Sequence, residues 1–235
     1  MAGLALYRPA EATFYLMKAG SPDALIPVAF GAKGDLPVAG DWDGNGTVTI
    51  GVYRPGDSTF YLRNSNTSGP PDLVVPLGAK GDRPVVGDWD GDGVTTVGVY
   101  RPAQSTFFLS NHNRPEPPAL TVPFGARGDV PVAGDWDGDR TVTIGVYRPG
   151  VATFLLRNQN TTGPPDFVVP FGASGDLPLS GDWDGDGVTT IGVYRPGTAT
   201  FFVRNANAPG DPDRTLVMGS KGDIPVVGPW AETQP

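Results

Sequence analysis

A repeat of 47 residues runs through the whole chain and constrains its fold more than any other feature. Its clearest markers are a tryptophan and a Gly-Asp aspartate, each of which returns five times at this spacing. Repeat lengths of roughly 20–50 residues are typical of solenoids, propellers and related arrays. The repeats fill all 235 residues, so we expect a single domain. The markers are Trp42, Trp89, Trp136, Trp183 and Trp230, with Asp35, Asp82, Asp129, Asp176 and Asp223.

Each repeat contains four short segments that alternate apolar and polar residues, as β-strands do, and turn residues separate them. In the third segment of one repeat, Phe107 and Leu109 share a face. Four antiparallel strands per repeat, arranged radially, describe a β-propeller blade, and known propellers have about 4–8 blades. A solenoid is the alternative, but it needs polar capping repeats, and neither end of the chain resembles one. In that repeat the segments cover residues 84–90, 95–102, 105–111 and 119–125.

The two ends of the chain predict that the ring closes. The chain begins with a segment of the second-strand type, residues 4–9, and ends with one of the first-strand type, residues 224–230. We expect the last segment to complete the first blade and leave no open edge. The prediction is an all-β fold, a five-bladed β-propeller. Its expected blades are residues 1–32 with 221–235, 33–79, 80–126, 127–173 and 174–220.

Composition excludes several functions. The net charge of −8 offers no basic surplus for the phosphates of nucleic acid. The absence of cysteine excludes disulfides and thiol nucleophiles, and no apolar run is long enough for a membrane span. The first residues lack the pattern of a signal peptide. We expect a monomer that is secreted or at the cell surface, with any leader outside this chain.

Four loops with the pattern Asp-x-Asp-x-Asp/Asn suggest calcium binding. Calcium takes about six to eight oxygen ligands, and such loops supply carboxylates around a glycine bend. Two features disfavour calcium: the ninth position is threonine in every loop, and Arg140 replaces a glycine in the third loop. The alternative is a capped hairpin turn, for which Asp-Gly and Asn-Gly are strong signals. The candidate calcium ligands are Asp41, Asp43, Asn45, Asp88, Asp90, Asp92, Asp135, Asp137, Asp139, Asp182, Asp184 and Asp186.

The tryptophans and a recurring Tyr-Arg-Pro element are candidate ligand contacts. A tryptophan could stack on a sugar, or it could pack between neighbouring blades, which the alternation favours. The arginine could bind a carboxylate or sugar hydroxyls, but pairing with a loop aspartate of its own or the next blade is favoured. The candidates are the five tryptophans, with Tyr53, Arg54, Tyr100, Arg101, Tyr147, Arg148, Tyr194 and Arg195.

The residues do not assemble a catalytic site. The chain has one histidine, His112, and no serine with a partner base. Acid–base catalysis needs two carboxylates in different environments, whereas the carboxylates here occupy identical turns. Repeated sites are instead suited to multivalent binding, in which linked weak sites gain avidity. We therefore expect a protein that is not an enzyme.

The run GDWDGDGVTTIGVYRP at 181–196, with segments such as TFYLRN at 59–64, resembles the FG-GAP/VCBS class of repeats. This class occurs in bacterial secreted and surface proteins and, in divergent form, in integrin α-subunit propellers. The resemblance implies a propeller whose calcium loops join the first and second strands of each blade on one face of the ring. Members of the class are adhesion modules, lectin-like binders and accessory domains. The period and blade number also resemble the tachylectin type of five-bladed lectin, which binds sugars between blades.

Together these features predict a multivalent binding module, directed at carbohydrate through repeated sites between the blades. The alternative is a structural or protein-interaction scaffold, either an accessory domain of a larger secreted or surface protein or an engineered symmetric propeller. The expected partner is thus a carbohydrate or a protein surface, and calcium is the one candidate cofactor.

Overall fold

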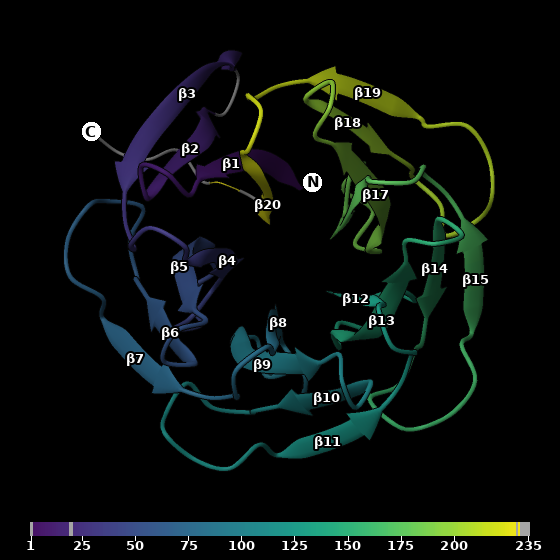
Figure 1. Cartoon of the computed structure of the whole chain (residues 1–235), viewed down its shortest axis with the longest axis horizontal. Helices are drawn as coiled ribbons and strands as arrows, with labels where there is room; N and C mark the ends of the chain where they lie inside the picture. Colours follow the sequence, from purple (N-terminus) through teal and green to yellow (C-terminus); the bar gives the residue numbers. More distant parts are fainter. Residues whose placement is uncertain (1, 19–20, 229, 231–235) are drawn as a thin grey trace.

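The computed structural model describes residues 2–18, 21–228 and 230. All regular structure in these ranges is β, arranged as five four-stranded antiparallel sheets around a central axis (Figure 1). This arrangement confirms the predicted all-β, five-bladed propeller. Within the same ranges there is no helix of the length and apolarity needed to cross a membrane.

Four blades take their strands in chain order, from the innermost to the outermost. Blade 2 contains β4 (Leu36–Gly40), β5 (Thr49–Arg54), β6 (Thr59–Leu62) and β7 (Leu73–Pro76). Blade 3 contains β8 (Arg83–Gly87), β9 (Thr96–Arg101), β10 (Thr106–Leu109) and β11 (Leu120–Pro123). Blade 4 contains β12 (Val130–Gly134), β13 (Thr143–Arg148), β14 (Thr153–Leu156) and β15 (Phe167–Pro170). Blade 5 contains β16 (Leu177–Gly181), β17 (Thr190–Arg195), β18 (Thr200–Val203) and β19 (Arg214–Val217).

Blade 1 joins the two ends of the chain, as predicted. Its inner strand is β20 (Ile224–Gly228), which pairs antiparallel with β1 (Gly3–Arg8), so that Gly3 faces Gly228 and Tyr7 faces Ile224. The closure is visible in Figure 1, where the yellow β20 lies beside the purple β1. This pairing satisfies the backbone groups that an open ring would leave at its two ends. The outer strands of the blade are β2 (Thr13–Lys18) and β3 (Ser21–Ala29).

The strands are shorter than the segments predicted from the alternation. The segment expected at 84–90 ends as a strand at Gly87, two residues before Trp89. Gly87 is the last residue of β8 to pair, with Thr96 of β9, and the aspartate-rich loop begins directly after it. Trp89 therefore lies in this loop, yet its side chain is buried. Apolar periodicity alone does not separate a buried loop residue from the end of a strand.

The hydrophobic core lies between neighbouring blades. In each blade a tyrosine of the second strand contacts a phenylalanine of the third, as Tyr100 and Phe107 do with ring centroids 4.7 Å apart. Trp89 and these two rings share one cluster with Ile144 and Val146 of the next blade. Burial of such side chains stabilises each by about 1.5–3 kcal/mol, so the same contacts that fill a blade also join it to its neighbour.

Backbone hydrogen bonds connect the aspartate-rich loop of one blade to the next blade. The amide of Thr95 in blade 3 donates to the carbonyl of Asp41 in blade 2 over 2.7 Å, and the Thr95 hydroxyl accepts from the Asp41 amide. Val142 donates in the same way to Asp88. The loops thus carry part of the ring's own architecture.

Candidate ligand-binding site

The first aspartate of each Asp-x-Asp-x-Asp/Asn loop caps the turn that follows it. In the loop of blade 3, one carboxylate oxygen of Asp88 accepts from the amides of Gly91 and Asp92, at 2.8 and 3.1 Å. Its other oxygen accepts from the amide of Gly93 at 2.8 Å. The third aspartate, Asp92, accepts from Val94. The turn is therefore complete with protein groups alone, as an aspartate cap predicts.

The same loops bring three carboxylates together. In three loops the carboxylate oxygens converge to within 4.8 Å of one another, and the second and third aspartates are exposed. The ninth position adds no ligand, because Thr96 is buried and its hydroxyl donates to the carbonyl of Gly87. Calcium favours six or more oxygens, so three carboxylates with solvent on one side fit a weak site and not a tight one. The converging sets are Asp88, Asp90 and Asp92; Asp135, Asp137 and Asp139; and Asp182, Asp184 and Asp186.

Arg140 occupies a left-handed backbone position in the loop of blade 4. Its φ is 75°, whereas the equivalent Gly46, Gly93 and Gly187 have φ of 84°, 91° and 92°. A Cβ at any of these glycines meets nothing within 4 Å, so the cost at Arg140 is backbone strain and not a clash. A side chain in this region costs about 1–2 kcal/mol.

The five tryptophans are buried, so their ring faces are covered by protein. Trp89, for example, packs with Val85 and Leu109 of its own blade and Ile144 of the next. The indole nitrogen of Trp42 donates to the carbonyl of Ile50 at 3.3 Å. With their rings packed in this way, the tryptophans form the blade junctions and do not line an open surface.

The tyrosines of the Tyr-Arg-Pro element are fully buried, one in each blade. Burial raises the pKa of Tyr147 to about 12, and the nearby carboxylate of Asp176 adds to the shift. The hydroxyl of Tyr147 donates to the carbonyl of Ala173 at 3.4 Å. These tyrosines are therefore part of the core. The other four are Tyr7, Tyr53, Tyr100 and Tyr194.

The arginines of the same element pair with the aspartates of the Gly-Asp markers, within their own blades. Arg101 donates from Nε and Nη2 to the two oxygens of Asp82, at 2.9 and 2.8 Å. Its guanidinium also lies over the ring of Phe108, with 4.4 Å to the centroid. Atom Nη1 makes no hydrogen bond within the described ranges, so it can donate to a ligand. The five pairs are Arg8–Asp223, Arg54–Asp35, Arg101–Asp82, Arg148–Asp129 and Arg195–Asp176.

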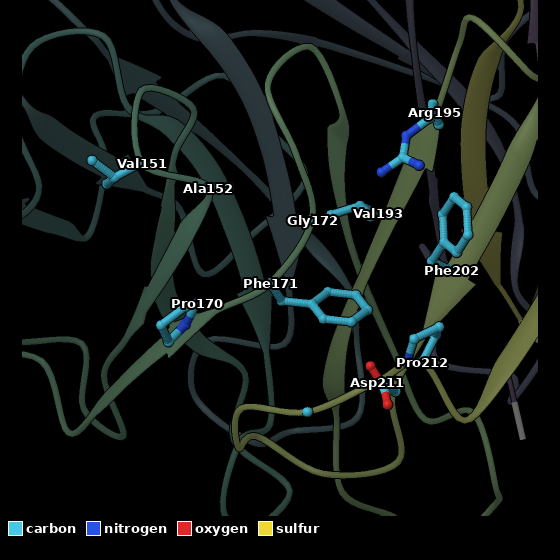
Figure 2. A pocket seen from close by; sticks show the side chains of 11 residues that line it. Val151, Ala152, Pro170, Phe171, Gly172, Val193, Arg195, Phe202, Asp211 and Pro212 are labelled. Atoms are coloured by element: carbon cyan, nitrogen blue, oxygen red, sulfur yellow. The ribbon is translucent and has the colours of Figure 1, made fainter.

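Two of these arginines, Arg148 and Arg195, line clefts between the blades. The cleft between blades 4 and 5, which we call cleft 4/5, encloses about 460 Å³, and cleft 3/4 encloses about 500 Å³. Figure 2 shows cleft 4/5 with Arg195 and Phe202 on one wall and Phe171 projecting from the other. The equivalent residues of cleft 3/4 are Arg148, Leu155 and Phe124. The repeat thus produces the same cleft at two successive junctions.

The candidate residues from the sequence include only part of this cleft. Arg148 and Arg195 were expected as ligand contacts, but Phe124, Phe171 and Phe202 were not. One available signal was the constant spacing of seven residues from each arginine to an outward side chain of the third strand. That signal identifies Tyr15, Tyr61, Phe108, Leu155 and Phe202.

Two other polar groups organise loops. Arg157 follows β14 and donates to the backbone carbonyls of Thr161 and Pro164, at 2.6 and 2.7 Å, which holds the loop before β15 closed. His112 contacts Glu116 at 2.6 Å in the corresponding exposed loop of blade 3. The polar groups of both loops are thus used in local structure.

No family model matches the chain, and no curated protein matches it.

Proposed function

We propose that this protein is a non-enzymatic, multivalent binding module that takes carbohydrate in the clefts between its blades. The observation that carries the proposal is the recurrence of one cleft, with the same combination of arginine and apolar wall, at successive junctions. Volumes of about 460 and 500 Å³ fall within the usual range for small-ligand sites, roughly 300–1,000 Å³.

The chemistry of the cleft suits a neutral polyhydroxylated ring. The charge of Arg148 is compensated by Asp129, with Nη2 and Oδ2 2.9 Å apart, so the cleft does not demand an anion. The free Nη1 can donate to a hydroxyl, while the half-buried Leu155 offers apolar surface to the carbon face of a sugar and the buried Phe124 completes the wall of the cleft. Several such weak sites on one ring gain avidity for a surface that displays many copies of the sugar.

The experiment is a glycan array, followed by titration of soluble hits with cleft-blocking variants. Val151 is 65% exposed at the rim of cleft 4/5, and Gln104 has the same position in cleft 3/4. Val151→Trp and Gln104→Trp together should lower the affinity at these clefts by about tenfold or more, which corresponds to about 1.4 kcal/mol. Val168→Trp is the matched control, because Val168 is exposed on β15 and lines neither cleft. An array without hits at high protein concentration contradicts the proposal.

The second candidate is a protein-interaction scaffold. It is favoured by exposed valines on the outermost strands of three blades, where unpaired strand edges face outward. Selective capture of one protein from culture medium, lost when these valines become lysine, would support it over carbohydrate binding. The valines are Val74, Val168 and Val217.

The proposal also covers the family relationship, the location of the protein and its binding of calcium. The aspartate-rich loops join the first and second strands of their blades, which supports a relationship to the FG-GAP/VCBS class and a secreted or surface-exposed monomer. Calcium would be held weakly by the converging carboxylates of blades 3 and 5. Because the turns close without metal, binding in the clefts does not depend on it.

A further inference from the structure

Cleft 4/5 carries a charged side chain that cleft 3/4 lacks. The loop between β18 and β19 carries Asp211 at the cleft, where the equivalent loops carry Pro70, Pro117 and Pro164. Asp211 is exposed, and in the described part of the chain no side chain forms an ion pair or hydrogen bond with its carboxylate. The carboxylate is therefore available to a ligand.

Two arginines supply the positive charge around this cleft. Arg195 is already compensated by Asp176, with Nη2 and Oδ2 2.8 Å apart. Arg204 donates from Nη1 to the backbone carbonyl of Asp211, but Arg157 donates to the carbonyl of Pro164 in the same way. The lining of cleft 4/5 therefore differs from that of cleft 3/4 by one negatively charged side chain, that of Asp211.

In cleft 4/5, Asp211 lies on the same wall as a hydrogen-bond donor and apolar side chains. Figure 2 shows Arg195, Phe202, Pro212 and Asp211 following one another along the blade 5 wall, with Phe171 facing them. A ligand that spans the cleft meets a hydrogen-bond donor at one end, an apolar middle and a carboxylate at the other end. Cleft 3/4 repeats the donor and the apolar middle, and its loop has Pro164 at the sequence position of Asp211.

We propose that cleft 4/5 takes a sugar that carries a free, protonated amine. The ammonium group lies at Asp211, the ring lies against the half-buried Phe202, and hydroxyls accept from Arg195. The inference rests on the proposed carbohydrate function and adds the ligand class of one cleft. Cleft 3/4 keeps its preference for neutral sugars, so the ring combines two specificities.

The chain supplies its own matched variants for the test. Asp211→Pro restores the residue of the sibling loops, and Pro164→Asp transfers the carboxylate to cleft 3/4 on an equivalent backbone. The probes are glucosamine, glucose and ethylammonium, titrated by NMR at a pH where the amines are protonated. The amide of Gly172 reports cleft 4/5, and the amide of Gly125 reports cleft 3/4.

We expect glucosamine to bind cleft 4/5 about fivefold more tightly than glucose, since one partly exposed charge pair contributes about 1 kcal/mol. Asp211→Pro should remove this preference and leave glucose binding unchanged. Pro164→Asp should create the same preference at Gly125.

The outcomes separate this inference from the proposed function. Equal binding of glucosamine and glucose at Gly172, or a preference that survives Asp211→Pro, overturns the amino-sugar inference and leaves carbohydrate binding intact. Ethylammonium binding at Gly172 without any response to either sugar supports the cation site and contradicts the carbohydrate function. No response to any probe overturns both.

Discussion

Arg101 and Asp82 form two parallel hydrogen bonds, 2.9 and 2.8 Å long, although 19 residues separate them in sequence. The side chain of Asp82 is only 1% exposed, and it also accepts from the amide of Ala79 at 2.8 Å. The pair fastens the loop before β8 to the end of β9, and every blade repeats it. Its bidentate geometry makes it the strongest ionic contact of the blade.

Removing the charge of Asp82 should destabilise the propeller. Asp82→Asn leaves the arginine without its counter-charge and places an amide donor next to it. Breaking a fully buried pair costs about 3–5 kcal/mol, and because Arg101 is partly exposed we expect about 2–3 kcal/mol in the free energy of unfolding. Urea denaturation measures the loss. The control is Asp90→Asn at an exposed loop position, and an equal effect of both variants would contradict the structural role of the pair.

Replacing Arg140 with glycine should stabilise the protein. The left-handed φ of 75° costs an L-residue about 1–2 kcal/mol, whereas the flexibility of glycine in the unfolded chain returns about 0.5–1 kcal/mol. The expected gain is about 0.5–1 kcal/mol, measured as a shift of the urea midpoint at constant slope. The reverse change, Gly93→Arg, should lower stability by a similar amount. A neutral result for both would show that this position carries no strain.

Alkaline pH should destabilise the fold through its buried tyrosines. Tyr7 and Tyr147 have pKa values raised from 10.0 to about 12 by burial, so the folded state keeps protons that the unfolded state releases. Stability is therefore fully present below pH 10 and falls between pH 10 and 12, by about 1.4 kcal/mol per pH unit for each such tyrosine.

Urea titrations across this range, with phenolate absorbance to follow ionisation, measure the effect. Tyr147→Phe should make the decline with pH shallower by the contribution of one group. A decline that is unchanged in this variant would assign the alkaline instability to other residues.

Calcium should raise the melting temperature modestly. A ligand that binds only the folded state stabilises it in proportion to the logarithm of its concentration over its dissociation constant. We compare the midpoint in chelator and in millimolar calcium, in the unaltered chain and in the Asp90→Asn/Asp92→Asn variant. A midpoint that calcium does not move identifies the loops as turns without a metal role.

The Asp-x-Asp-x-Asp/Asn loops illustrate why a local pattern leaves a function open. Asp88 was equally compatible with a calcium ligand and with a turn cap, because both use a carboxylate beside a glycine bend. The structure shows the cap, with three amides on Asp88, and shows that the hydroxyl of Thr96 is turned to Gly87.

The residues that line the clefts could not be paired from the sequence pattern. Phe171 and Phe202 belong to different blades and meet only when blades 4 and 5 pack together, so neither the repeat nor the alternation identifies them as partners. Asp211 replaces the proline found at this position in three other repeats, but whether it can contact a ligand depends on the blade 4 residues across the cleft. The role of a residue that departs from the repeat depends on its contacts with the neighbouring blade.

The sequence by itself determined the five-bladed ring, its closure by the last strand and the inward side chains of the third strands. These features follow from the 47-residue period and from the alternation of apolar and polar residues, which are local properties that recur in all five repeats. Only the tertiary structure decided that Arg101 pairs with Asp82, that the tryptophans and tyrosines are covered, and that clefts remain at the junctions. Those outcomes depend on which surfaces of successive blades come into contact, and packing across a junction involves residues that are distant in the chain.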